Sequence, residues 1–200
     1  MIEFKLFGMT IRIHFLFVAL VTLFLLTDEK NVAFLSLLAC IIHELAHVIA
    51  FMIVSYTPIA LDFEITGLRL TASPHKLSIG KELFVQVAGC LMNFILFFSF
   101  YFSLTQINSL SIITVAHLII GIFNMLPLKS FDGGKILMLI LTKTIRVDIA
   151  LKICDIVDGV FLLLLFIAGV FLFLKIQTFT LFLLVCWLIF IFLMKSKKKA

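Results

Sequence analysis

The feature that most constrains the fold is an apolar stretch from Val32 to Ser55, which is long enough to cross a lipid bilayer as a helix. Near its middle lies His43-Glu44-Leu45-Ala46-His47, an H-E-x-x-H pattern. A helix turns once in about 3.6 residues, so His43 and His47 share one face and can converge on one metal ion. In this pattern two neutral histidines bind Zn²⁺, while the glutamate takes a proton from the attacking water without being a ligand. The stretch therefore predicts a zinc site inside a membrane span, with Glu44 as the general base.

The alternative interpretation of this motif is an ordinary solvated helix face, which is common when such residues occur in soluble proteins. At bilayer depth each ionisable residue costs roughly 2.5–3.5 kcal/mol, and three of them occur here within five positions. Folding alone does not require that cost. The placement therefore favours a metal site.

The composition predicts an all-α polytopic membrane protein. The 200 residues are 64% hydrophobic and only 14% charged, which lies far outside the range of soluble domains. Apolar runs of membrane-spanning length predict about six transmembrane helices. They are Ile11–Leu26, Val32–Ser55, Leu83–Leu104, Leu110–Leu126 with a broken continuation to Leu141, Val157–Leu174 and Ile176–Met194.

The net charge of +5 could indicate nucleic acid as a partner, but the distribution of the basic residues indicates membrane topology instead. With the N-terminus inside, twelve of the sixteen lysines and arginines fall in cytoplasmic segments. Only Lys30 and Lys175 fall on the opposite side, and Lys129 and Lys135 lie in the broken fourth span. Both termini are therefore predicted to face the cytoplasm, and no nucleic-acid partner is expected.

Two segments alternate apolar and polar residues and predict small interfacial β-hairpins. The first is Met1–His14, with Gly8 between its halves, and the second is Ile59–Ala72, with Gly67 between its halves. The second hairpin could be a simple cytoplasmic loop. It could also be a strand edge that pairs with an extended substrate segment.

The fourth span is interrupted by Asn124-Met125-Leu126-Pro127-Leu128-Lys129-Ser130-Phe131-Asp132-Gly133-Gly134-Lys135, which cannot remain an unbroken helix. Backbone freed at membrane depth must be sheltered by protein or line a wet cavity. Asp132 could then supply the third protein ligand that a catalytic zinc needs, and Asn124, Pro127 and Gly133 are candidates for positioning the substrate. The alternative is a solvated D-G-G turn at the membrane edge.

Together these residues resemble the site-2 protease family of intramembrane zinc metalloproteases, which share H-E-x-x-H and a later N-P-x-P-x-x-x-x-D-G. Asn124, Pro127, Asp132 and Gly133 fall in register with the second motif, whereas Met125 replaces its first proline. The segment Ala88-Gly89-Cys90-Leu91-Met92-Asn93 is similar to the family's A-G-P-L-x-N, with cysteine in place of proline. The resemblance implies one zinc ion per chain and a membrane-associated protein substrate.

Within the family, the short layout and the Asp-Gly-Gly-Lys sequence resemble members from endospore-forming bacteria. That resemblance implies a sigma-factor precursor as substrate, the mother-cell membrane around the forespore as location, and membrane-protein inhibitors as partners. We expect a single membrane-embedded peptidase domain over residues 1–200, without a CBS or PDZ domain.

Two other functions compete with the protease interpretation. A metal-ion transporter would spread its ligands over two inverted repeats, whereas here they are concentrated in two motifs. A protease-like binding protein without activity would be expected to have lost Glu44, which this chain keeps. We therefore predict a zinc endopeptidase in the cell membrane.

Overall fold

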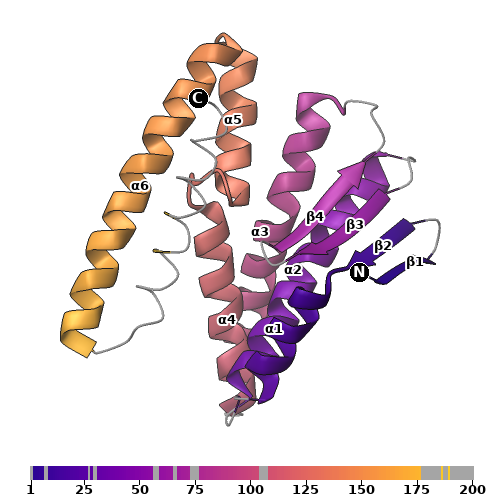
Figure 1. Cartoon of the computed structure of the whole chain (residues 1–200), viewed down its shortest axis with the longest axis vertical. Helices are drawn as coiled ribbons and strands as arrows, with labels where there is room; N and C mark the ends of the chain where they lie inside the picture. Colours follow the sequence, from indigo (N-terminus) through magenta and orange to yellow (C-terminus); the bar gives the residue numbers. More distant parts are fainter. Residues whose placement is uncertain are drawn as a thin grey trace. The chain divides into compact units, whose positions relative to one another are not determined.

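The computed structural model describes residues 2–6, 9–26, 28, 31–55, 59–64, 67–72, 77–103, 108–176, 186 and 189. Contacts divide the chain into two compact units, Met1–Met125 and Leu126–Ala200. The described residues of the first unit form four strands and four helices, and those of the second form a helical pair (Figure 1). The expectation of one peptidase domain over the whole chain stays a prediction.

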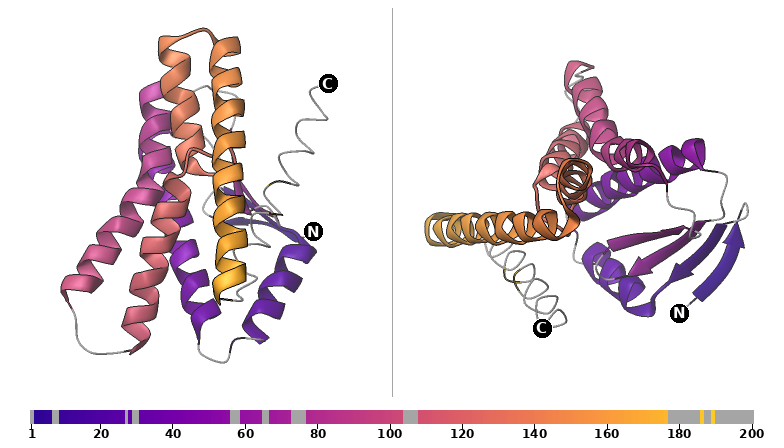
Figure 2. Two further views of the ribbon diagram at one scale, coloured as in Figure 1. Left: turned by 90° about the vertical axis from the view of Figure 1, so that its left-hand side faces the viewer. Right: turned by 90° about the horizontal axis from the view of Figure 1, so that it is seen from above.

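The strands of the first unit form one four-stranded sheet in the order β1-β2-β3-β4. The strands β1 (Ile2–Leu6) and β2 (Met9–Ile13) form one antiparallel hairpin, and β3 (Ile59–Glu64) and β4 (Gly67–Ala72) form the other. Both predicted hairpins are therefore present. Their joining by a parallel β2–β3 pairing was not predicted, because it links strands that lie far apart in the sequence (Figure 2).

Charged side chains help to set the register of this sheet. Arg12 on β2 lies opposite Glu3 on one side and Asp62 on the other. Its guanidinium approaches the two carboxylates at 3.2 and 3.5 Å. Because opposite charges at facing positions favour one pairing over a slipped one, this row specifies the parallel contact that joins the hairpins.

Helices α1 (Phe15–Leu26), α2 (Val32–Val54), α3 (Ile79–Phe102) and α4 (Asn108–Met125) complete the first unit. The helices α2, α3 and α4 all pack against one another. Glycines at their contacts permit close approach, as is usual for membrane helices. Gly89 of α3 lies against His43 and His47 of α2, and Gly121 of α4 lies against Phe94 of α3.

Three described helices are long and apolar enough to cross a membrane: Val32–Val54, Ile79–Phe102 and Val147–Lys175. Two shorter apolar helices are Phe15–Leu26 and Ile112–Met125. The first predicted span, Ile11–Leu26, begins too early, because Ile11 to Ile13 pair with β3 instead of entering the helix. The chain is thus a mostly helical membrane protein, and its sixth predicted span, Ile176–Met194, lies almost wholly outside the described residues.

The second unit begins with the predicted helix break and continues as α5 (Asp132–Thr144) and α6 (Val147–Ile176), which pack side by side (Figure 1). Helix α6 starts ten residues before the predicted Val157. Its first turns carry charged residues, and two of them bind the break: Asp155 pairs with the Lys129 ammonium, and Asp158 accepts the Lys129 N–H at 3.1 Å. These bonds offset the cost of carboxylates in a span, which is why hydropathy alone places the boundary too late.

Candidate metal centre

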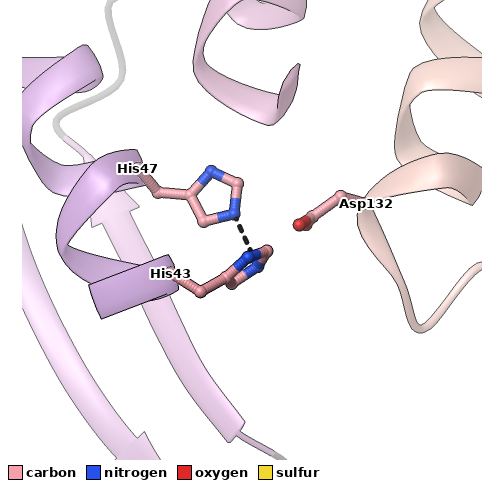
Figure 3. Close-up of side chains that lie close together, drawn as sticks. All are labelled: His43, His47 and Asp132. Carbon is pink, nitrogen blue, oxygen red and sulfur yellow. Dashed lines mark hydrogen bonds between the residues drawn. The ribbon is translucent and has the colours of Figure 1, made fainter. Parts of the chain in front are cut away.

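His43 and His47 lie side by side in the middle of α2, as their helical spacing predicts. Both side chains are buried in the first unit. Their Nε2 atoms are 3.2 Å apart, and the rings meet edge to face with an interplanar angle of 86° (Figure 3). Two imidazole nitrogens are thus aimed at the same point.

The neighbouring helix α3 determines which nitrogen of His47 carries the hydrogen. His47 Nδ1 lies 2.7 Å from the carbonyl oxygen of Val85, and because a carbonyl can only accept, Nδ1 carries the hydrogen. His47 Nε2 then has an unshared electron pair facing His43. A second ring nitrogen held by a carbonyl is the usual arrangement for a histidine that binds a metal.

The residues present fit a zinc ion. Zinc binds histidine nitrogens at about 2.0–2.1 Å in tetrahedral geometry, which places two such nitrogens roughly 3.3 Å apart. The observed 3.2 Å between the Nε2 atoms matches that spacing. Gly89 on α3 keeps the space open, since a Cβ there would lie 2.7 Å from His43 Cε1 and closer still to His47 Nε2.

His43 is held from its other side by two residues, one of which the sequence reasoning missed. His43 Nδ1 lies 3.0 Å from Asn93 Nδ2, and Asn93 Oδ1 lies 2.9 Å from His117 Nδ1 on α4. Asn93 and His117 are both fully buried. His117 is an ionisable residue inside the predicted Leu110–Leu126 span, and such a position could have marked it as a functional candidate.

Glu44 follows His43 on α2 and is half-buried, in contrast to the two buried histidines. The helix turns by about 100° between successive residues, so Glu44 is offset from the imidazole pair but remains in the same turn. This offset is the one that the H-E-x-x-H pattern gives its glutamate, and the role of Glu44 as general base stays a prediction.

Asp132 is the first residue of α5 and is buried in the second unit (Figure 3). Lys135 Nζ donates to its Oδ1 at 3.0 Å. A carboxylate in the first turn also interacts favourably with the free N–H groups of the helix start. Gly133 is buried beside it.

The predicted helix break lies at Leu126 to Phe131, directly before Asp132. The Leu128 N–H bonds the Leu126 carbonyl at 2.7 Å across Pro127, and the Phe131 N–H bonds the Leu128 carbonyl at 2.8 Å. The Leu128 carbonyl also lies against Gly134, where a Cβ would collide with it. Two tight turns therefore satisfy part of the backbone that the broken helix exposes.

Asn124 and Pro127 occupy different local settings. Asn124 is the last residue but one of α4, is half-buried, and donates from Nδ2 to the Ile120 carbonyl one turn earlier at 3.1 Å. Pro127 is half-buried within the turns of the break. Neither position tests whether these residues contact a substrate, so their positioning role stays a prediction.

Comparison with known proteins agrees with this geometry. The sequence model of Peptidase family M50 matches residues 103–168, a stretch that includes Asn124, Pro127 and Asp132. The solved structure of the Site-2 Protease from Methanocaldococcus jannaschii is similar, with 25% sequence identity and a TM-score of 0.64, covering 94% of this chain and 92% of that one. No curated protein sequence matches the chain.

A mostly helical membrane fold with a buried histidine pair fits a membrane metalloprotease. Two similarities agree with that class: part of the chain matches the model of peptidase family M50, and the fold is similar to that of a site-2 protease.

Proposed function

We propose that the chain is a zinc endopeptidase that cleaves membrane-associated protein substrates. The observation that carries this proposal is the buried His43–His47 pair, with Nε2 atoms 3.2 Å apart in a helix of membrane-spanning length. Zinc bound there would make water acidic enough to supply a nucleophile near neutral pH. Glu44 takes the water's proton and returns it to the leaving amine.

The proposed ligand set is His43, His47 and Asp132. All three side chains are buried. Three protein ligands with an open fourth position are what a catalytic zinc requires. A buried carboxylate in the D-G-G segment has a function in this arrangement, whereas a solvated turn would leave it exposed.

Metal analysis of the purified full chain tests the ligand set. Alanine substitution of His43, His47 or Asp132 is expected to abolish stoichiometric zinc binding, while Glu44→Gln keeps it because Glu44 is not a ligand. Full zinc content in Asp132→Ala would remove Asp132 from the set.

The protease activity itself is tested by co-expressing the chain with candidate membrane-associated precursors. We expect cleavage by the wild type and none by Glu44→Gln, because the amide cannot take a proton. Glu82→Gln, the same chemical change in the first turn of α3, is the matched control and should cleave normally. Cleavage by Glu44→Gln would refute the assignment of the base.

The substrate is proposed to enter as an extended chain, because a helix hides its scissile carbonyls in its own hydrogen bonds. Within the described sheet β3 has neighbours on both sides, while β4 pairs only with β3 and is an edge strand. An extended segment adding to β4 would be held through its backbone without dependence on its sequence. Of the two strands in the Ile59–Ala72 hairpin, we therefore propose β4 as the one that pairs with the substrate.

The site is proposed to open toward the cytoplasm. His47 precedes Ser55 by eight residues, which is about 12 Å along the helix. The charge distribution predicts that Ser55 and both termini lie on that side. Lys76 and Lys30 lie outside the described residues, and each can be replaced by cysteine in turn. A thiol reagent added outside the cell should not label a cysteine at position 76, but it should label one at position 30. The reverse pattern would overturn the topology.

The sequence resembles one particular member, the stage IV sporulation protein FB protease of endospore-forming bacteria. The resemblance rests on Asn-Met-Leu-Pro followed by Asp-Gly-Gly-Lys at residues 124–135. We propose accordingly that the substrate is a sigma-factor precursor whose N-terminal pro-sequence reaches the site from the cytoplasm, at the mother-cell membrane around the forespore. Failure to process any such precursor, with other membrane proteins cleaved, would leave only the general protease function.

A further inference from the structure

Four hydrogen bonds form one directional chain through the first unit, running from α4 through α3 to α2. With its amide nitrogen toward His43 and its oxygen toward His117, Asn93 accepts from His117 Nδ1–H and donates to His43 Nδ1. His43 must then carry its hydrogen on Nε2, where it donates to His47 Nε2. His47 Nδ1–H ends the chain on the Val85 carbonyl.

This direction is compatible with a metal-free site but not with zinc held by both histidines. A neutral histidine that binds metal through Nε2 carries its hydrogen on Nδ1. His43 Nδ1–H needs an acceptor, and the group that faces it 3.0 Å away is the NH₂ of Asn93, which can only donate. Asn93 must therefore turn its oxygen toward His43.

The turned amide changes the tautomer of His117. Its NH₂ group now faces His117 Nδ1, which must accept and so must lose its hydrogen to Nε2. His117 Nε2 is buried and has no hydrogen-bond partner within the described part of the chain, so neither tautomer is locked by a neighbour on that side. His117, which is linked to the ligand His43 through Asn93, can thus change its tautomer when the site binds or loses zinc.

We propose that Asn93 and His117 form a relay of positioning residues that sets which nitrogen of His43 carries its hydrogen, and that zinc binding reverses the direction of this relay. The inference rests on the proposed zinc site. It adds two residues that hold His43 ready for the metal without touching the metal or the substrate.

Zinc affinity of the full chain, measured in detergent by competition with a chelator, tests the relay by substitution. Asn93→Leu removes the acceptor and should weaken zinc binding about ten- to a hundredfold, the usual effect of losing a partner of a ligand histidine. Asn93→Asp should restore the wild-type affinity, because a carboxyl group accepts from His43 Nδ1–H. Thr114→Val, which removes a buried hydroxyl one turn before His117, is the control and should bind zinc normally.

The tautomers provide a readout that a merely structural role would not change. Nitrogen-15 spectra of the histidine-labelled full chain at pH 8, where ordinary imidazoles are neutral, distinguish Nδ1–H from Nε2–H. His117 should be Nδ1–H in the metal-free protein and Nε2–H after addition of Zn²⁺. His117→Phe, which keeps a ring against Phe100, assigns the signals by their loss.

The outcomes separate the two proposals. A wild-type chain that binds no zinc would refute the proposed metal site. A chain that binds zinc while His117 keeps one tautomer, or while Asn93→Leu binds zinc as tightly as wild type, would refute the relay and leave the metal site standing.

Discussion

Replacing Gly89 with alanine tests how closely α3 approaches the two imidazoles. The added Cβ would lie 2.7 Å from Cε1 of both His43 and His47, and closer still to His47 Nε2, whereas ordinary contact begins near 3.4 Å. Each ring would have to retreat by about 0.7 Å or more. Such a shift would disturb the hydrogen bond from His47 Nδ1 to the Val85 carbonyl, which is 2.7 Å long.

The expected magnitude follows from the tolerance of metal sites, where ligand distances hold within about 0.2 Å. A displacement several times larger should lower zinc affinity by about a hundredfold or more, and overpacking should cost about 1–3 kcal/mol of stability. Chelator competition and thermal unfolding of the detergent-solubilised chain measure both quantities.

The matched control is Gly80→Ala, on the same helix, where a Cβ would meet nothing within 4 Å. It should bind zinc normally and be stabilised by about 0.5–1 kcal/mol, since alanine favours a helix over glycine. If Gly89→Ala bound zinc as well as Gly80→Ala, α3 could not lie against the histidine pair as described.

Three further predictions concern the break and the substrate. Gly134→Ala should displace the Leu128 carbonyl and reduce cleavage at least tenfold in a co-expression assay, while Gly159→Ala, which meets nothing within 4 Å, should not. Asp158→Leu should lower the unfolding free energy by about 1–3 kcal/mol, because it leaves the Lys129 N–H without its acceptor. Asp158→Asn should lower it less, because the amide oxygen still accepts. Equal losses in the two variants would contradict this role of Asp158. Helix-breaking residues near the scissile bond of a substrate should raise its cleavage rate, and Asn124→Ala should lower that rate with zinc content unchanged; equal cleavage of helix-stabilised and helix-broken substrates would count against extended entry.

Local periodicity determined a large part of this protein. The one-turn spacing of His43 and His47 is a property of any helix, so their convergence could be predicted before any packing was known. The alternation in the two hairpins likewise specified their strands. Pro127 and the glycines near Asp132 predicted the break, because they act on their own backbone.

Contacts between distant segments were decided only in the tertiary structure. The parallel pairing of β2 with β3 depends on how the chain returns after α2, which no local pattern records. The start of α6 was misplaced because bonds from Asp155 and Asp158 to Lys129 offset charges that hydropathy counts as unfavourable. The partners of Asn93 lie on two other helices and could not be named from the sequence around it. A buried amide indicates only that it needs hydrogen-bond partners. Geometry across three helices, which sequence spacing does not encode, is what joins His117 to the histidine pair.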